Sequence, residues 1–366
     1  MKIILLGPFP VGNKGLNGQS IANKTLLDGL QESHDVDFIN TAKDLEFTDK
    51  KDQGKFKIGK FLQILVGFIR EIAKILFGKY DVIYMTPGQS FLGFMRFSPY
   101  MLVSFIKKIP CYIHIHGSKF RDMYDKQTKI KKSMIRFLLK KLSGVIVLGD
   151  SLRFMFEDLI EKDKIYVCKN GVQDYVVASI EEIKSKLNRF KHSKKRKIMY
   201  LSNLMKSKGI LEVLEATKEF SADEIEFNFA GAVEPEIKEI FEKYLKSYSN
   251  KIKYYGIVSG VEKKKLLLGN DIFVLPSWDE GQPISILEAY VTGCAVITDQ
   301  SIGGIKDIFD EENGYSCRIK NSASIVNGIK LLWDSDEVIL KNYLYGTKYY
   351  CSHNFIKNII DILMRV

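Results

Sequence analysis

Residues 271–298 read DIFVLPSWDEGQPISILEAYVTGCAVIT and contain the clearest pattern of strands and helix in the chain. An apolar run, Ile272–Leu275, leads into a loop that contains Gly281 and Pro283. A helical pattern follows, and a second apolar run, Ala295–Thr298, closes the stretch. Short continuous runs of this kind are typical of strands covered on both faces. A helix between two of them indicates a right-handed crossover between parallel strands, so the stretch predicts a β–α–β unit.

The same alternation of apolar runs and helix-length segments recurs along the chain. We expect further strands at Lys2–Leu6, Val36–Ile39, Val82–Met85, Cys111–Ile115, Val145–Leu148, Ile165–Cys168, Lys197–Leu201, Ile225–Ala230 and Ile252–Tyr255. At roughly 100–200 residues per domain, a length of 366 residues suggests two domains, with a third within range. The sequence therefore predicts an α/β protein with two doubly wound parallel-sheet domains in series.

A charged segment, Ser179 to Lys197, separates the last strand of the first half from the first strand of the second. It ends in the run KHSKKRK, and we interpret it as a linker whose end, Lys194–Lys197, is solvated. The join is placed near residue 178, giving domains 1–178 and 179–342. The tail 343–366 is helical in pattern, and we expect it to pack back on the first domain.

Composition limits the class of protein. Hydrophobic residues make up 46% and charged residues 27% of the chain, a globular balance that excludes a disordered or fibrous protein. The five cysteines are scattered without zinc-site spacing, which indicates a reducing compartment with mostly buried thiols such as Cys294. The N-terminal run MKIILLGPFP is too short for a signal-peptide core, and no wholly apolar run reaches 18 residues. We expect a cytoplasmic protein.

The net charge of +11 is concentrated in one half of the chain. Residues 1–175 carry 28 Lys and Arg against 18 Asp and Glu, a net of +10, and the remainder carries +1. Such asymmetry indicates an anionic partner for the first half: nucleic acid, a membrane surface or a phosphorylated lipid.

One basic stretch, Lys55 to Tyr80, has helical periodicity in its apolar residues. A helix of this kind either lies in a membrane interface or packs on a core with its basic face in solvent. Because amphipathic helices usually face a core, we favour the second interpretation. The apolar positions are Phe61, Leu62, Leu65, Phe68, Ile69, Ile72, Ile75 and Leu76, and the cations are Lys55, Lys57, Lys60, Arg70 and Lys74.

The strongest chemical signal is a pair of carboxylates, Glu280 and Glu288. Glu280 lies in the loop after a buried strand, and Glu288 lies early in a helix that begins near Ile284 or Ser285. A helix N-terminus attracts anions, and a carboxylate accepts hydrogen bonds from hydroxyls, so the layout suits a sugar plus a phosphate. Two glutamates at this spacing, taken alone, are more often simply solvated.

In its full context the pair resembles the nucleotide-sugar site of the family 4 retaining glycosyltransferases, which have the GT-B fold. The resemblance extends over nearly the whole chain. It is carried by DIFVLPSWDEGQPISILEA (271–289), GCAVIT (293–298), GGIKDI (303–308), IMYLSNLMKSKG (198–209), KNGV (169–172), YIHIHG (112–117) and GPFPVGNKGLNGQ (7–19). It implies two Rossmann-like domains that face a cleft, with the donor held mainly by the second and the acceptor mainly by the first.

The resemblance also implies roles for individual residues. Glu280 would bind the hydroxyls of the donor sugar, Glu288 the ribose hydroxyls and Lys208 the diphosphate, while His116 would face the sugar from the first domain. Glu280, Lys208 and His116 are the implied catalytic group. The further implied donor-binding positions are Asn203, Gly18, Gln19, Gly231, Gly256, Ile257, Val258, Gly281, Gln282, Pro283 and Ile284.

The chain departs from the family pattern in two places. Asn203 stands where the family often has an arginine, and Lys206 is a candidate to replace that cation. Gln282 and Pro283 replace a common Phe-Gly pair, so the identity of the donor sugar does not transfer. The reaction would need no metal or cofactor, because Lys208, Asn203 and helix N-termini would stabilise the leaving diphosphate while the acceptor hydroxyl attacks from the same face.

The remaining candidate residues are two histidines and the glycines of the first loop. His114 and His116 are expected to point to opposite faces of a strand, which would prevent them from sharing a metal. His114 is interpreted as a core residue, and His116 as a site residue at the carboxyl end of a parallel strand. For the glycines of the first loop, a turn and a phosphate-binding role are equally favoured; these are Gly12, Gly15 and Gly18.

Three functions are compared. The first is a retaining, metal-independent glycosyltransferase. It would move a sugar from a nucleotide donor, with UDP favoured, to a lipid-linked saccharide in O-antigen- or capsule-type polysaccharide synthesis, at the anionic inner face of the membrane. The second is a nucleotide-sugar epimerase or a phosphorylase of the same fold, although neither signature is seen. The third, a nucleic-acid-binding protein, is disfavoured because arginine is scarce and the cations are dispersed, so we expect no nucleic-acid partner.

Overall fold

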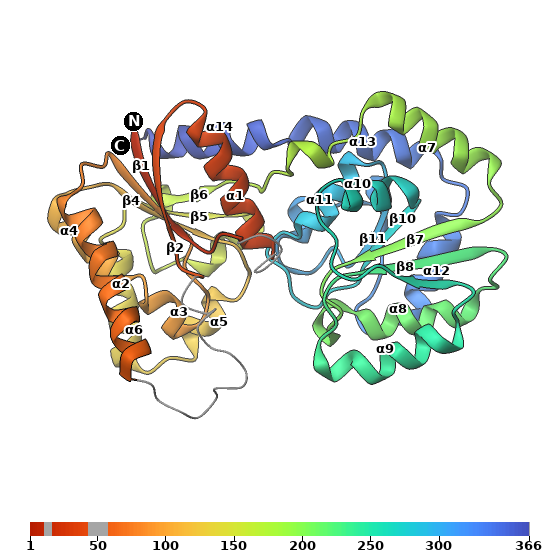
Figure 1. Cartoon of the computed structure of the whole chain (residues 1–366), viewed down its shortest axis with the longest axis horizontal. Helices are drawn as coiled ribbons and strands as arrows, with labels where there is room; N and C mark the ends of the chain where they lie inside the picture. The colour runs from red at the N-terminus through yellow and green to blue at the C-terminus, as the bar shows by residue number, and fades with distance from the viewer. Residues whose placement is uncertain (11–16, 43–57, 366) are drawn as a thin grey trace. The chain divides into compact units, whose positions relative to one another are not determined.

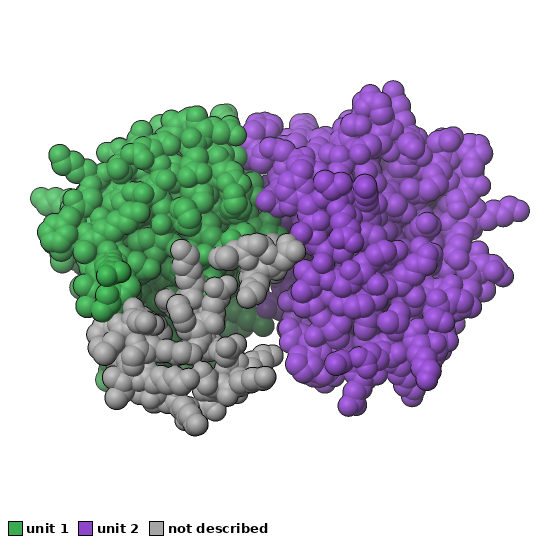
Figure 2. Space-filling view, in the orientation of Figure 1, with its two compact units in different colours: residues 1–169, 355–366 green, residues 170–354 purple. Residues whose placement is uncertain are grey.

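The computed structural model describes residues 1–10, 17–42 and 58–365, and for 58–65 it describes the helical backbone alone. The chain forms two compact units, Met1–Lys169 with Phe355–Val366, and Asn170–Asn354 (Figure 2). The units divide at 169/170 and 354/355, whereas the sequence suggested 178 and 342/343. Residues 343–354 therefore remain with the second unit.

The first unit is built on a parallel sheet with strand order β2-β1-β3-β4-β5-β6 (Figure 1). Its strands are β1 (Lys2–Gly7), β2 (Asp35–Asn40), β3 (Val82–Met85), β4 (Cys111–Ile115), β5 (Gly144–Val147) and β6 (Ile165–Val167). Its helices are α1 (Gly18–Gln31), α2 (Ile58–Phe77), α3 (Phe91–Met95), α4 (Ser98–Lys107), α5 (Phe120–Asp125), α6 (Lys129–Leu139) and most of α14 (Ser352–Leu363).

Alternate residues of β1 supply two separate hydrophobic layers. Ile4 and Leu6 belong to the layer formed with α4 and α6, and Ile3 and Leu5 belong to the layer formed with α1 and α14. This follows from the period of two in a strand, which sends successive side chains to opposite faces. The sheet is therefore covered on both sides, as its continuous apolar runs predict.

The second unit contains the other parallel sheet, with strand order β12-β11-β10-β7-β8-β9. Its strands are β7 (Arg196–Leu201), β8 (Ile225–Ala230), β9 (Ile252–Tyr254), β10 (Ile272–Leu275), β11 (Ala295–Thr298) and β12 (Gly314–Ser316). Its helices are α7 (Ile180–His192), α8 (Ile210–Ala216), α9 (Pro235–Ser247), α10 (Gly260–Gly269), α11 (Ile284–Val291), α12 (Ser322–Leu331) and α13 (Glu337–Tyr349).

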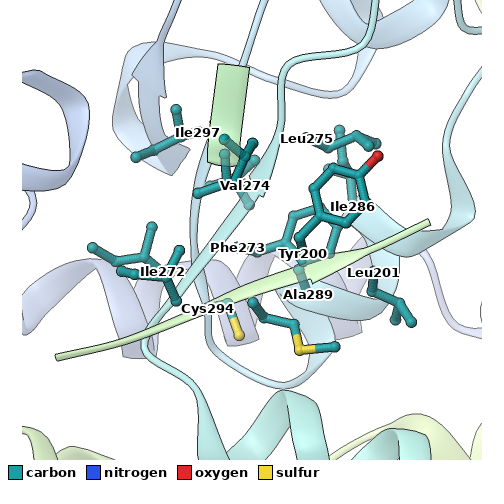
Figure 3. Packing of buried hydrophobic residues seen from close by; sticks show 14 of the residues in the cluster. Tyr200, Leu201, Ile272, Phe273, Val274, Leu275, Ile286, Ala289, Cys294 and Ile297 are labelled. Atoms are coloured by element: carbon teal, nitrogen blue, oxygen red, sulfur yellow. The ribbon is translucent and has the colours of Figure 1, made fainter. Parts of the chain in front are cut away.

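The centre of this unit is a buried cluster in which β7 and β10 pack against α11 (Figure 3). Tyr200, Phe273 and Ile286 are among its members and have almost no exposed surface. The predicted pair of doubly wound parallel sheets is confirmed by the two strand orders.

The expected linker, Ser179 to Lys197, is wrong as a description of this segment. Residues Ile180–His192 form α7, whose N-terminus has a capping box between Ser179 and Glu182. Lys186 is buried and donates to the carbonyls of Leu267 and Thr292. Some charged side chains of this segment therefore make core contacts in the second unit, and others lie on a solvated face.

No helix in the described part of the chain is both long enough and apolar enough to cross a membrane.

Candidate active site

The second sheet changes direction between β7 and β10, because successive strands are added on either side of that pair. In open parallel sheets, ligands bind at the carboxyl ends of the strands at such a switch point. The loop after β7 carries Lys208, and the loop after β10 carries Glu280. Topology therefore brings these two residues to the place where a ligand is expected.

Lys208 and Glu280 form an ion pair in which Lys208 Nζ lies 2.6 Å from Glu280 Oε1. The same ammonium lies 3.4 Å from the carbonyl oxygen of Asp279. Burial raises the pKa of Glu280 above its usual value, although the charge and hydrogen bond of Lys208 oppose that shift. The pair is a partly exposed cation next to a carboxylate, which can bind a phosphate and a sugar hydroxyl respectively.

The backbone fixes the position of this pair. Gly209 has φ +72°, and a Cβ at this position would lie 2.4 Å from the carbonyl oxygen of Pro276, so glycine permits the two loops to meet. The hydroxyl of Ser277 donates to the carbonyl of Ser207 at 3.1 Å, and the amide of Trp278 donates to the same oxygen at 2.8 Å. The loop after β10 is thus hydrogen-bonded to the turn that carries Lys208.

Glu288 lies in the second turn of α11 and is almost fully buried. Its carboxylate accepts a hydrogen bond from Lys263 Nζ, and the Lys263 side chain is buried as well. Lys263 belongs to α10 and was not found by sequence reasoning, since nothing in the run VEKKK distinguishes it from its two lysine neighbours. Glu288, the residue implied to bind the ribose, is therefore held by the ammonium of Lys263.

Gly231 and the segment Gly256–Val258, which the resemblance implies line the nucleotide base, follow β8 and β9. The amide of Gly231 donates to the carbonyl of Gly256 at 2.8 Å, and Tyr254 donates its hydroxyl to the carbonyl of Gly231 at 2.8 Å. Gly231 has φ +139°, and a Cβ there would lie 1.9 Å from the carbonyl oxygen of Ser202. Next to this contact, the side chain of Ile257 is well exposed.

Val258, by contrast, is buried in the hydrophobic cluster of the second unit. A direct contact between its side chain and a base would need a rearrangement of that packing.

Asn203 and Lys206 follow β7. Asn203 is exposed, and its carbonyl accepts a hydrogen bond from Tyr200 at 3.3 Å. Lys206 Nζ lies 3.6 Å from a carboxylate oxygen of Glu236 on α9. The candidate replacement for the missing arginine is thus engaged with a carboxylate rather than with the Lys208 pair.

Gln282, an implied donor-binding residue, is hydrogen-bonded to Asn170. Its Oε1 accepts a hydrogen bond from the amide of Asn170 at 2.6 Å, and Asn170 Nδ2 donates to the Gln282 carbonyl at 3.3 Å. The KNGV segment is thus bonded to the loop that precedes α11. Gly281, Pro283 and Ile284 are buried alongside, and the helix begins at Ile284 as expected.

In the first unit, the expected orientation of the two histidines is wrong. The rings of His114 and His116 lie 4.2 Å apart between centroids, because residues two apart in a strand project to the same face. His114 is fully buried, as expected, and its Nδ1 lies 2.7 Å from the hydroxyl of Tyr84. Burial, together with the neighbouring His116, lowers the pKa of His114 well below its usual value. His116 lies just beyond β4 and is partly exposed.

Gly18 is the first residue of α1, next to the carboxyl ends of β1 and β3, where the first sheet changes direction. Gln19 Nε2 donates to the carbonyl of Thr86 at 2.6 Å. The other two glycines considered with Gly18 lie at 12 and 15, outside the described residues.

The described residues contain no group of three or more His, Cys, Asp or Glu side chains that could hold a metal ion. Two Asp-x-Asp triplets occur in the sequence, at 35–37 and 334–336, and their carboxylates pair with lysine and arginine. Asp37 lies 2.9 Å from Lys74 Nζ, and Asp336 lies 3.0 Å from Lys191 Nζ.

Residues 179–345 match the model of the protein family described as "Glycosyl transferases group 1". The Campylobacter jejuni N,N'-diacetylbacillosaminyl-diphospho-undecaprenol alpha-1,3-N-acetylgalactosaminyltransferase is 25% identical over 224 residues, which cover 57% of this chain and 58% of that relative. The match thus spans less than two thirds of that protein. The Escherichia coli UDP-Gal:alpha-D-GlcNAc-diphosphoundecaprenol alpha-1,3-galactosyltransferase is 23% identical over 313 residues, 78% of this chain and 74% of the relative.

Among solved structures, Anabaena Alr3699/HepE in complex with UDP and glucose aligns over 100% of both chains with a TM-score of 0.74 and 15% identity. At that identity the likeness concerns the fold, and it confirms the predicted GT-B architecture.

Proposed function

We propose that this protein is a retaining glycosyltransferase whose second unit binds a nucleotide-sugar donor at the carboxyl edge between β7 and β10. The observation that carries the proposal is the Lys208–Glu280 ion pair, which topology places at the switch point of that sheet. The family match supports the proposal, because residues 179–345 include both members of the pair.

The residues of the pair suit glycosyl transfer. Breaking the bond between the sugar and the diphosphate leaves negative charge on the phosphate, and Lys208 would stabilise that charge. Glu280, held 2.6 Å from Lys208, would accept hydrogen bonds from sugar hydroxyls and orient the anomeric carbon. The acceptor hydroxyl would attack from the face that the diphosphate leaves, and a phosphate oxygen would take its proton. We propose that the reaction proceeds without a metal ion or cofactor.

The nature of the substrates is inferred from relatives. HepE was solved with UDP, and the E. coli relative is named for a UDP-linked galactose donor, so we favour a UDP-sugar. Both named relatives act on saccharides linked to undecaprenol through a diphosphate, so we propose a lipid-linked acceptor in polysaccharide synthesis. The net charge of +10 on residues 1–175 would favour peripheral binding to the anionic inner face of the membrane.

A screen of nucleotide sugars tests this proposal. The measured quantity is the amount of nucleoside diphosphate that the protein releases from each sugar donor. We expect Glu280→Gln to keep the fold and to lower turnover at least ~10²-fold, on the scale of a lost electrostatic contact in the transition state. The anomeric configuration of the product, measured by NMR, distinguishes retention from inversion. Near-normal turnover in a folded Glu280→Gln variant would remove Glu280 from the active site, and interconversion of free nucleotide sugars would favour the epimerase alternative.

A further inference from the structure

A stripe of exposed apolar side chains runs along α6. Ile130, Met134 and Phe137 are 76%, 43% and 53% exposed, and their spacing of four and three residues puts them on one helix face. On another face, Ile135 and Leu139 have no exposed surface and pack into the core of the first unit. The helix thus satisfies its core contacts and still presents a second apolar face.

The neighbouring helix α4 presents a similar stripe. Leu102, Phe105 and Ile106 are 37%, 48% and 71% exposed. Lys141, just after α6, joins the two stripes, because its Nζ lies 3.9 Å from the ring centre of Phe105 and 5.3 Å from that of Phe137. We name this continuous patch the α4–α6 surface; its members are Leu102, Phe105, Ile106, Ile130, Met134, Phe137 and Lys141.

The two helices that carry the α4–α6 surface have cationic side chains and no acidic ones. The sequence from 126 to 142 contains seven Lys and Arg and no Asp or Glu, and the sequence of α4 with the following Lys108 likewise has no acidic residue. Lys129, Arg136 and Lys140 are exposed on the flank of the α6 stripe. Among the ion pairs between described residues, none engages a cation of α6. These cations are therefore available to an anionic partner.

The helix α2 has both core contacts and exposed apolar side chains. Of the apolar residues in its described part, Ile75 is fully buried, and Phe68 and Ile72 pack against the core. The core interpretation of this helix accordingly holds for these residues, whereas its other large apolar side chains are exposed; these are Val66, Ile69, Leu76 and Phe77. Figure 1 shows α2, α4 and α6 together at one side of the first unit.

We propose that the α4–α6 surface docks on a bilayer that contains anionic phospholipid. Aliphatic and aromatic side chains at this surface would enter the boundary between headgroups and acyl chains, and the lysines and arginine around them would contact lipid phosphates. Large apolar side chains flanked by lysine and arginine match a lipid interface, which is apolar at the acyl chains and anionic at the phosphates. This assignment rests on the membrane binding of the proposed function and gives it a place on the chain, and it does not depend on the chemistry of the second unit.

Sedimentation with vesicles tests this docking surface. The parent protein should bind vesicles of phosphatidylcholine with 30% phosphatidylglycerol at low salt and leave pure phosphatidylcholine vesicles largely unbound. A variant with Phe105→Ser, Ile130→Ser and Phe137→Ser should lose at least tenfold in partition coefficient. A variant with Lys129→Glu, Lys140→Glu and Lys141→Glu should lose the preference for anionic vesicles. The matched control, Leu331→Ser with Leu344→Ser, changes exposed leucines of the second unit and should bind as the parent does.

Two results would overturn the proposal: vesicle binding by the serine variant equal to that of the parent, or equal partition of the parent to neutral and anionic vesicles. Circular dichroism of each variant checks that it is folded. Glu280→Gln should bind vesicles normally, so a failure of the glycosyl-transfer proposal is recognised separately from a failure of this one.

Discussion

Glu288 and Lys263 form the most deeply buried ion pair at the candidate site, with side chains 3% and 7% exposed. A buried pair of this kind adds little to stability compared with apolar replacements, but removal of one partner leaves a buried charge without compensation. The pair therefore holds the Glu288 carboxylate in a defined position. We infer that this restraint prepares Glu288 for contact with a ribose.

Lys263→Met should destabilise the second unit by about 3–5 kcal/mol, because Glu288 would remain buried without its cation. Lys263→Met combined with Glu288→Leu should recover most of that loss. Both tryptophans, Trp278 and Trp333, lie in the second unit, so their fluorescence during urea unfolding reports on this unit alone. If the Lys263→Met variant were as stable as the parent protein, the ion pair between Lys263 and Glu288 would not form in solution.

At the scale of elements, α14 couples the end of the chain to its beginning. Phe355, Ile359 and Ile362 of α14 share a buried cluster with Leu5 of β1 and Leu26 of α1. The same helix lies close to α1 at Gly29, where a Cβ would lie 2.0 Å from Ile356 Cδ1. The first sheet thus depends on residues from the far end of the sequence for one of its two covering layers.

Ile359→Ala should destabilise the first unit by roughly 2–5 kcal/mol, since it removes a fully buried side chain from this layer. Lys357→Ala, at an exposed position of the same helix, should change stability by no more than about 0.5 kcal/mol. Thermal unfolding followed by circular dichroism compares the two variants. Equal losses for both would mean that α14 does not pack as described.

Elements were predictable from sequence where burial is two-sided. Most strands of both sheets read as apolar runs, and the run at 272–275 matches β10 at both ends. The strand β12 (Gly314–Ser316) was missed because its three residues form no apolar run. The helix α7 was mistaken for a linker because its charges were given more weight than the capping signal of Ser179 and Glu182, which the sequence does contain.

The candidate site was predictable to the extent that it lies in loops directly after strands. Lys208 and Glu280 follow β7 and β10, so sequence order and the rule for parallel sheets bring them together. The partners Lys263 and Asn170 were not predictable, because packing between distant elements selects them and no local pattern marks them. The error over His114 was one of reasoning, since the period of a strand places residues two apart on one face.

Across the whole molecule, the net charge is unevenly distributed between the two halves of the chain. The first half carries nearly all of the net positive charge, and the second half is close to neutral. A concentrated positive field increases the encounter rate with an anionic surface, and a near-neutral unit leaves phosphate binding to a few positioned cations. We propose that Lys208, held against Glu280 at the edge of the second sheet, is such a cation.

Calorimetric titration with uridine and UDP tests whether the second unit binds the donor at the carboxyl edge between β7 and β10. Lys208→Ala should weaken UDP binding by roughly one to two decades and leave uridine binding nearly unchanged, because a charge-assisted hydrogen bond contributes about 1.5–3 kcal/mol. Glu288→Ala should weaken uridine and UDP alike, since its proposed partner is the ribose that both contain. If Lys208→Ala bound UDP as tightly as the parent protein, the diphosphate would not lie at this edge of the sheet, and the proposed donor site would be wrong.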